Sequence, residues 1–244
     1  MNIAVIFAGG VGSRMKTGGI PKQFLEVSGK PILAHTLSVF DAHDEIDAIV
    51  LVMVESWIAQ AEQLVKEYGF HKVARVVAGG ETGQLSIYNG LVAAQSLACA
   101  DDASRTIVLV HDGVRPVIDA DLLSANIAGV KEHGSAITCV PCKETVVMVD
   151  EAGSQVMRTV ERAKTRIAKA PQSFYLDELL AAHERALAAG RKDVIDSCTM
   201  MQMFGAISPA VVEGSFDNIK VTTPEDYYTL KVLLDFHSGN LEEV

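Results

Sequence analysis

Short apolar runs, each bounded by glycine or by polar residues, recur along the chain. Residues 3–8 are almost purely apolar and lead directly into a glycine-rich stretch, and residues 46–54 and 106–110 are equally rich in β-branched side chains. Such runs are typical of strands that are buried on both faces of a parallel sheet. Residues 136–140 have the same character and are expected to form a fourth strand.

Segments with a different period lie between and after these runs. Apolar residues recur near i, i+3 and i+4 spacing, as in amphipathic helices, over residues 31–41, 57–68, 86–98, 176–189 and 224–236. Gly190 marks a helix end, while Thr223 and Pro224 are suited to the N-cap and first position of the last helix.

The alternation of strands and helices predicts an α/β fold with a doubly wound, mostly parallel sheet, whose ligands bind at the carboxyl ends of the strands. The sequence contains no internal repeat and no low-complexity linker, so one domain over residues 1–244 is expected.

Residues 143–169 interrupt this rhythm. Two β-rich pieces, E-T-V-V-M-V and Q-V-M-R-T-V, flank a turn from Asp150 to Gly153, which predicts a hairpin arm. An arm that projects from a compact core exposes strand edges and apolar side chains, and pairing with a second subunit covers both. The sequence therefore predicts a homodimer formed through the arm.

Composition narrows the classes of function. The chain has 244 residues with 49% hydrophobic and 21% charged residues, and no apolar stretch near the ~20 residues that a membrane span requires. The N-terminus lacks the pattern of a secretory signal, so a cytoplasmic location without membrane association is expected. The net charge of −10 argues against nucleic acid as a partner.

The four cysteines include a C-x-x-C pair, Cys139 and Cys142. No second Cys/His pair follows at zinc-finger spacing, and a β-type run follows where a thioredoxin-like motif opens a helix. We expect ordinary, partly buried thiols.

A glycine-rich loop directly after the first strand is the strongest single chemical feature. It reads A-G-G-V-G-S-R-M over residues 8–15. Glycines allow backbone N–H groups to approach a phosphate closely. The loop lacks both the third glycine of the dinucleotide fingerprint and the G-K-[ST] of a P-loop. Arg14 and Lys22 are cations that could bind one phosphate chain. The alternative is that both are solvated side chains on the surface.

Two further clusters fall at expected strand or helix ends. The first, H-D-G-V-R-P, lies at the end of the strand at residues 106–110. Asp112 is suited to bind a ribose hydroxyl or a metal, and Arg115 is suited to bind a phosphate. The alternative is that the two residues form a buried structural ion pair. His111 is given no catalytic role. In the second, D-N-I-K-V-T-T-P, Lys220 on a strand-like segment precedes the last helix.

Five motifs, A-G-G-V-G-S-R-M, P-K-Q-F, H-D-G-V-R-P, A-P-Q-S-F and D-N-I-K-V-T-T-P-E-D, resemble in order those of the cytidylyltransferases that act on methylerythritol phosphate and ribitol 5-phosphate. The resemblance covers nearly the whole chain. It implies a Rossmann-like nucleotidyltransferase fold with a dimerising arm, and a reaction that joins a small polyol phosphate to the CMP part of CTP and releases pyrophosphate. It also implies Mg²⁺, held mainly by the CTP phosphates and near Asp112, with no protein residue assigned as a metal ligand.

The resemblance also implies roles for individual residues. It assigns catalysis to Arg14, Lys22 and Lys220. It assigns CTP binding to Ala8, Gly9, Gly10, Gly12, Ser13, Gly80, Ser86 and Asp112. It assigns the polyol phosphate to Arg115, Thr145 and Arg162, with Arg162 reaching in from the partner subunit.

Two departures bear on the substrate. Residues 81–85 lack the arginine that the family usually has before Ser86, and Ala170 replaces a threonine. Some features resemble the ribitol 5-phosphate enzymes: the G-G-V-G-S-R-M motif, Trp57 and the D-S-C-T stretch that begins at Asp196. Others resemble the 2-C-methyl-D-erythritol 4-phosphate enzymes: residues 143–145 and 159–162. Ribitol 5-phosphate is slightly preferred as the substrate.

Two other classes of protein share some of these features. A dinucleotide-dependent oxidoreductase would need an acidic residue ~20 positions after the glycine loop, but Glu55 lies farther along. A non-catalytic nucleotide sensor could dispense with Lys22 or Lys220, yet the chain has both.

Overall fold

The structure is a computed structural model of residues 1–244, and it describes all of them except 10–18, 99–105, 206 and 241–244. Its centre is a seven-stranded sheet in the order β11-β7-β10-β6-β1-β4-β5. All pairings in this sheet are parallel except those of β10, which is antiparallel to both β6 and β7. In chain order the strands are β1 (Asn2–Ala8), β4 (Ala48–Met53), β5 (Val73–Ala78), β6 (Ile107–Asp112), β7 (Ser135–Pro141), β10 (Arg166–Tyr175) and β11 (Val211–Glu213).

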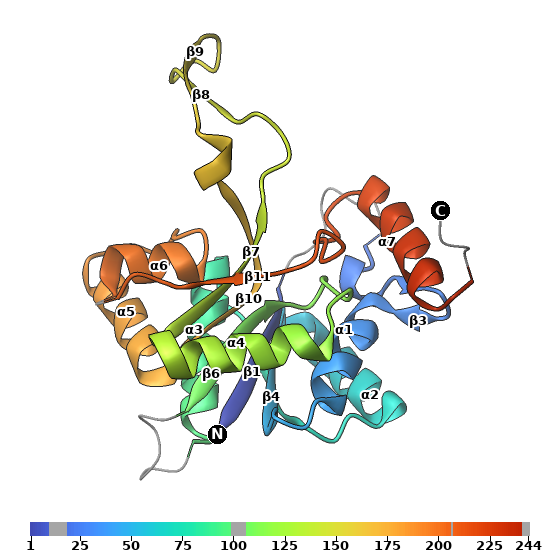
Figure 1. Ribbon diagram of the computed structural model, residues 1–244. Helices are drawn as coiled ribbons and strands as arrows, with labels where there is room; N and C mark the ends of the chain where they lie inside the picture. Colours follow the sequence, from blue (N-terminus) through green and yellow to red (C-terminus); the bar gives the residue numbers. More distant parts are fainter. Residues whose placement is uncertain (10–18, 99–105, 206, 241–244) are drawn as a thin grey trace.

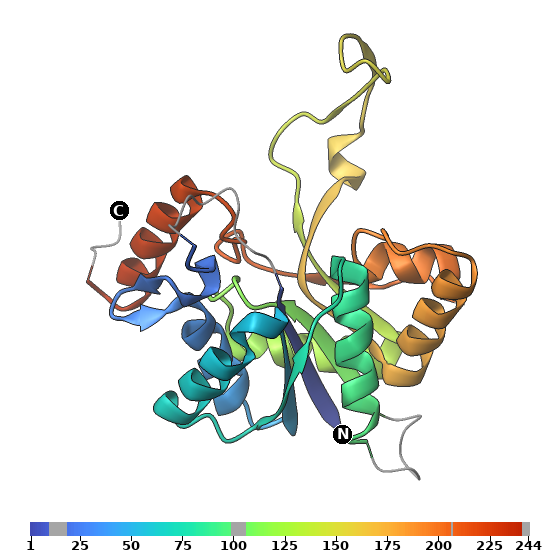
Figure 2. The ribbon, with the colours of Figure 1, turned by 180° about the vertical axis from the view of Figure 1, so that it is seen from behind.

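Helices cover both faces of the sheet, as Figures 1 and 2 show from opposite sides. On β1, Ile3 and Val5 pack with one layer of helices and Ala4 and Ile6 with the other, because side chains alternate along a strand. The first layer contains α3 (Gly83–Gln95), α5 (Leu176–Ala188) and α6 (Ser197–Phe204); the second contains α1 (Ile32–Ala42), α2 (Ile58–Tyr68) and α4 (Ala120–His133). The doubly wound, mostly parallel α/β fold is therefore confirmed.

A smaller apolar cluster fixes the C-terminal helix, α7 (Pro224–His237), beside the main sheet. Leu230 of α7 packs there with Val221 and Val114. The helix begins with the predicted N-cap, Thr223, in a capping box with Asp226. Short elements complete the N-terminal half: η2 (Lys22–Phe24), β2 (Glu26–Val27), β3 (Lys30–Pro31) and η3 (Glu55–Trp57).

The predicted hairpin projects from the body of the molecule as an arm (Figure 1). Its strands, β8 (Val147–Val149) and β9 (Val156–Thr159), form a sheet of their own, and η5 (Arg162–Lys164) leads back to β10. Residues 166–169, placed in the arm by the sequence, already belong to β10 of the main sheet, where Arg166 pairs with Pro141. Within the described residues, no helix is both long and apolar enough to cross a membrane.

Candidate active site

The candidate site lies where the carboxyl ends of β1 and β6 meet. These strands are neighbours, with Phe7 paired to Asp112 at their ends. From β1 the sheet continues on one side through β4 and β5 and on the other through β6. Such a reversal of strand order opens a crevice at the strand ends, which is where doubly wound folds bind ligands.

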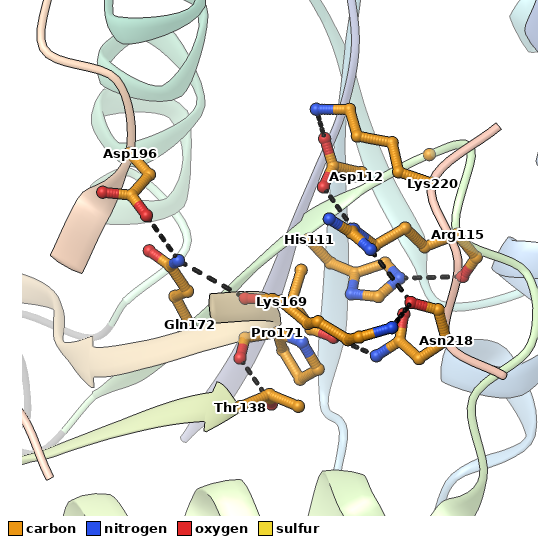
Figure 3. A network of polar contacts seen from close by, with 12 residues as sticks. His111, Asp112, Arg115, Thr138, Lys169, Pro171, Gln172, Asp196, Asn218 and Lys220 are labelled. Atoms are coloured by element: carbon orange, nitrogen blue, oxygen red, sulfur yellow. Dashed lines mark hydrogen bonds and ion pairs between the residues drawn. The ribbon is translucent and has the colours of Figure 1, made fainter. Parts of the chain in front are cut away.

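Asp112 is the centre of this region (Figure 3). One carboxylate oxygen lies 2.5 Å from the Lys220 ammonium, and the other accepts a 2.8 Å hydrogen bond from Arg115 Nε. Burial alone would raise the pKa of the Asp112 carboxyl, but the charges of Lys220 and Arg115 outweigh it and hold that pKa below its ordinary value. Asp112 is therefore ionised and orients two cations.

Arg115 and His111 tie this centre to the neighbouring loop. Arg115 Nη1 donates to the carbonyl of Asn218 at 3.0 Å, and His111 Nε2 donates to the carbonyl of Arg115 at 3.0 Å. Burial lowers the pKa of His111 to about 4, so the ring is neutral near pH 7. His111 is completely buried, and its hydrogen bond to the Arg115 carbonyl fits a structural role.

A pocket of about 270 Å³ opens on the β1 side of Asp112. Its floor includes the end of β1 and its wall the start of α3, where Thr82 caps the helix by accepting from the Leu85 N–H. The polar backbone of a helix start and the cations around the pocket suit an anionic ligand. The lining residues are Phe7, Ala8, Gly9, Lys22, Gln23, Gly80, Glu81, Thr82, Gly83, Ser86, Asp112, Val114 and Lys220.

Close packing explains the two glycines before α3. The Gly80 N–H donates to Ser86 Oγ at 3.1 Å. A Cβ on Gly79 would lie 2.7 Å from that oxygen, and one on Gly80 would lie 2.4 Å from Leu85 Cβ. Only glycine fits at these positions without displacing the start of α3.

A second pocket, of about 300 Å³, adjoins the first and shares Phe7, Gly83, Asp112 and Lys220 with it. Its other walls come from β10, β6 and the start of α6. The remaining lining residues are Ile87, Val110, Arg115, Ala168, Lys169, Ala170, Gln172, Ile195, Asp196 and Ser197. Two ligand-sized hollows thus meet at one ion-pair centre.

The structure brings most of the predicted site residues together. Ala8, Gly9, Lys22, Gly80, Ser86, Asp112 and Lys220 line the first pocket, and Arg115 lines the second. Gly10, Gly12, Ser13 and Arg14 lie outside the described residues, so their roles stay predictions. Lys220 lies on a loop, not on the strand-like segment expected for it. The Val221 N–H does donate to the Val114 carbonyl, but Val221 belongs to no sheet.

Thr145 and Arg162 do not line either pocket of their own chain. Both are exposed on the arm, where Arg162 Nη1 donates to the Lys143 carbonyl at 3.4 Å. Their predicted contact with the polyol phosphate stays a prediction.

Several pocket residues were not predicted as functional. Gln23 closes the first pocket and donates to the Ala8 carbonyl at 2.7 Å. In the second pocket, Gln172 donates to Asp196 Oδ2 at 2.9 Å and accepts from the Cys198 N–H at 2.8 Å. The P-K-Q and A-P-Q motifs contain both glutamines, so the sequence did carry that signal. Lys169 belongs to no motif with a known chemical role.

Metal-binding and redox chemistry have little support among the side chains. In the parts of the chain that the structure describes, no group of three or more His, Cys, Asp or Glu residues gathers as a metal cage. Cys139 and Cys142 are free thiols, but they are buried, not partly buried as the sequence predicted; Cys198 is a partly buried free thiol.

Comparisons with known proteins agree with this geometry. The family model of 2-C-methyl-D-erythritol 4-phosphate cytidylyltransferase matches residues 2–235. The ribitol-5-phosphate cytidylyltransferase of Streptococcus agalactiae serotype III is 52% identical over 96% of each chain. The 2-C-methyl-D-erythritol 4-phosphate cytidylyltransferase of Clostridium botulinum (strain 657) is 39% identical over 92% of this chain and 93% of that one.

A solved structure extends the likeness to three dimensions. The 4-diphosphocytidyl-2C-methyl-D-erythritol synthase of Anaerococcus prevotii superposes with a TM-score of 0.81 at 28% identity, and the match covers 96% of each chain. The adjoining pockets, the ordered motifs and these matches together lead to one conclusion: this chain belongs to the 2-C-methyl-D-erythritol 4-phosphate cytidylyltransferase family and is a nucleotidyltransferase.

Proposed function

We propose that this enzyme transfers CMP from CTP to D-ribitol 5-phosphate, giving CDP-ribitol and pyrophosphate. The observation that carries the proposal is the pair of adjoining pockets that share Asp112 and Lys220, because two such pockets suit a nucleotide and a phosphorylated acceptor bound side by side. The choice of acceptor rests on similarity, since the ribitol-5-phosphate enzyme of S. agalactiae is 52% identical and the C. botulinum methylerythritol-phosphate enzyme 39%.

In the proposed reaction, an oxygen of the acceptor phosphate attacks the α-phosphorus of CTP. The bond from that phosphorus to the bridging β-phosphate oxygen breaks, and pyrophosphate leaves with the electron pair. The acceptor phosphate is already ionised near neutral pH, so a protein base is not needed. Rate enhancement then comes from positioning and from cations that stabilise the developing charge.

Three cations are suited to that work. Lys22 lines the first pocket and Lys220 lies at the junction of the pockets, while the sequence adds Arg14. Asp112 holds the Lys220 ammonium in place, and Arg115 faces the second pocket, where the acceptor phosphate would lie. A fixed cation stabilises a transition state better than a mobile one because it needs no reorganisation.

Mg²⁺ is proposed as the cofactor and, when bound, would supply positive charge that offsets the negative charge of the phosphates. Both oxygens of Asp112 already pair with cations, and the described residues contain no group of three or more His, Cys, Asp or Glu side chains that could bind a metal ion. The residues therefore fit an ion that is held mainly by the CTP phosphates, with Asp112 near it but not required as a ligand.

We further propose a cytoplasmic homodimer that forms through the arm. Apolar side chains of β8 and β9 are exposed in the single chain, among them Met148, Val149, Val156 and Met157. Pairing of two arms would cover them and could bring Thr145 and Arg162 to the partner's acceptor pocket. The free thiols fit a reducing compartment. The product would serve polyol-containing polymers of the cell surface.

The second candidate acceptor is 2-C-methyl-D-erythritol 4-phosphate, an isoprenoid precursor, which the family description favours. The deciding experiment measures pyrophosphate release with CTP and Mg²⁺, offering each polyol phosphate in parallel, with ATP, GTP and UTP as nucleotide controls. Release with ribitol 5-phosphate alone supports the proposal. Release with methylerythritol phosphate alone would make that compound the acceptor in place of ribitol 5-phosphate. Nucleotide binding without release would indicate a non-catalytic sensor.

A further inference from the structure

The loop that carries Lys220 is held from several sides, and its main contact comes from a residue without an assigned role. Lys169 Nζ donates to the carbonyl of Phe216 at 3.1 Å and to that of Asn218 at 2.9 Å. The Asn218 carbonyl also accepts from Arg115 Nη1 at 3.0 Å. Figure 3 shows both cations converging on Asn218 next to the Asp112–Lys220 pair.

The same loop is fixed by the Asn218 side chain and by the residue after Lys220. Asn218 is completely buried, and its Nδ2 donates to the Ala170 carbonyl at 2.6 Å. The Val221 N–H donates to the Val114 carbonyl at 3.0 Å. Lys220 therefore lies between two residues that are fixed by hydrogen bonds, Asn218 and Val221. Lys169 helps to fix the first of them, because its ammonium donates to the Asn218 carbonyl.

Residues at both ends of the range 143–169, which leads into and out of the arm, contact this loop. Lys143, at the start of the predicted arm, places its ammonium 3.6 Å from the ring centroid of Phe216. Lys169, at the end of that range, binds the carbonyls of Phe216 and Asn218. The base of the arm and the loop with Lys220 thus form one connected unit.

Holding a charge at this place is costly. Lys169 is partly buried on β10, and burial together with the nearby positive charge of Arg115 lowers the pKa of its ammonium. Hydrogen bonds from an ammonium to carbonyls are stronger than those between neutral groups. Replacing such a donor would leave the Phe216 carbonyl without this partner and the Asn218 carbonyl with Arg115 alone.

We propose that Lys169 is a positioning residue of the reaction: it fixes the loop from Phe216 to Lys220 and so aims the Lys220 ammonium at the junction of the two pockets. The proposal rests on the proposed function in so far as Lys220 acts in CMP transfer. It does not place Lys169 in contact with the reacting atoms, although its side chain also borders the acceptor pocket.

The test compares Lys169→Met, which keeps the length of the side chain and removes the charge, with Lys169→Arg and a matched control. Lys131→Met is the control because Lys131 is 60% exposed on α4, outside the arm, pairs with Glu45 and lines neither pocket. Amide hydrogen exchange of peptides covering residues 215–222 reports on the loop directly. Steady-state assays give kcat and the KM for each substrate.

We expect faster exchange of this loop in Lys169→Met and a ten- to hundredfold loss of kcat, in line with the usual effect of misplacing a catalytic group by about 1 Å. The KM for CTP should stay within about threefold, Lys169→Arg should recover most of the loss, and Lys131→Met should match the wild type. Unchanged exchange in Lys169→Met would refute the proposal. So would a rise in the acceptor KM alone, which would make Lys169 a ligand of the acceptor phosphate.

The exchange measurement needs no turnover, so it separates this inference from the proposed function. If the wild type used neither polyol phosphate, the proposed function would fail, while faster exchange in Lys169→Met alone would still support the anchoring of the loop. Normal turnover by the wild type with unaltered exchange and kcat in Lys169→Met would remove the inference and leave the proposed function standing.

Discussion

The ammonium of Lys220 lies 2.5 Å from the carboxylate of Asp112, although one residue is on the loop before α7 and the other ends β6. The remaining Asp112 oxygen pairs with Arg115 at 2.8 Å. One carboxylate therefore orients two of the cations that border the acceptor pocket, Lys220 and Arg115. The structure thus shows the buried ion pair that the sequence offered as the structural alternative for the H-D-G-V-R-P motif, and the contacts of Asp112 and Arg115 with substrates stay predictions.

Replacing Lys220 with Gln should lower kcat by about 10²- to 10³-fold, because loss of one preorganised group that stabilises transition-state charge has effects of this size. Folding should be retained, since Lys220 is 40% exposed and Asp112 keeps Arg115 as its partner. The assay is pyrophosphate release, with a thermal melt of the same sample. Lys231→Gln, at an exposed position of α7, is the matched control. Near-normal turnover by Lys220→Gln would exclude a catalytic role.

Replacing Asp112 with Asn should lower both activity and stability. The change leaves Arg115 and Lys220 without their carboxylate, and breaking a buried ion pair from one side costs about 3 kcal/mol of the free energy of unfolding. Urea unfolding measures this loss. The control, Asp193→Asn, breaks an exposed ion pair with Arg191 and should change stability by no more than about 0.5 kcal/mol. Equal stability of the two variants would contradict the assigned burial of the pair.

Much of the fold could be predicted because buried parallel strands and amphipathic helices have distinct periods. The four predicted strands correspond to β1, β4, β6 and β7. Strand β10 was missed for a physical reason: it contains Pro171, which argues against a central strand, and the structure accommodates it at an irregularity in the pairing with β7 between Ala168 and Gln172. Its place between β6 and β7 depends on the chain returning from the arm, which no local pattern encodes.

Other elements left weaker or overlooked signals. Strand β5 includes exposed Arg75 at the sheet edge, so its apolar run is interrupted. Helix α4 was not predicted. It begins after the N-cap residue Asp119 and ends at Gly134 in the left-handed conformation, both of which are common helix-end signals that the hydrophobic pattern does not contain.

Most of the site could be predicted from motifs, but the supporting contacts could not. Gly9 directly follows β1, Lys22 begins η2 and Lys220 precedes α7, so the place of these three residues near the sheet edge follows from the fold. The bonds from Lys169 to the Phe216 and Asn218 carbonyls join residues that are distant in the sequence, and backbone carbonyls leave no mark in a residue pattern.

The arm should control the oligomeric state. Met157 is 68% exposed on β9, and replacing it with Glu places a charge in the proposed subunit contact. We expect the variant to be monomeric by sedimentation at a concentration where the wild type is dimeric, with reduced kcat/KM for the acceptor. Val232→Glu, at a 57% exposed position on α7, is the control and should remain dimeric. A wild type that is monomeric under these conditions would overturn the dimer.

His183 should make the enzyme sensitive to acid. Its side chain is buried, both ring nitrogens lack a hydrogen-bond partner in the described structure, and burial lowers its pKa to about 4. The unfolded chain binds a proton at a pKa of about 6.5, so stability is fully present above that pH and falls as the pH drops toward about 4. The group should account for a loss of about 2 kcal/mol between pH 7 and pH 5.

Replacing His183 with Leu should therefore flatten the stability profile between pH 7 and pH 5, as measured by urea unfolding at each pH. The slope is the informative quantity, because the altered packing shifts stability equally at both pH values. His133→Leu, at an exposed position at the end of α4, is the control and should keep the wild-type slope. His111, which is also buried with a pKa of about 4, leaves a residual slope in both variants. A wild-type slope in His183→Leu would mean that the ring reaches water before the chain unfolds.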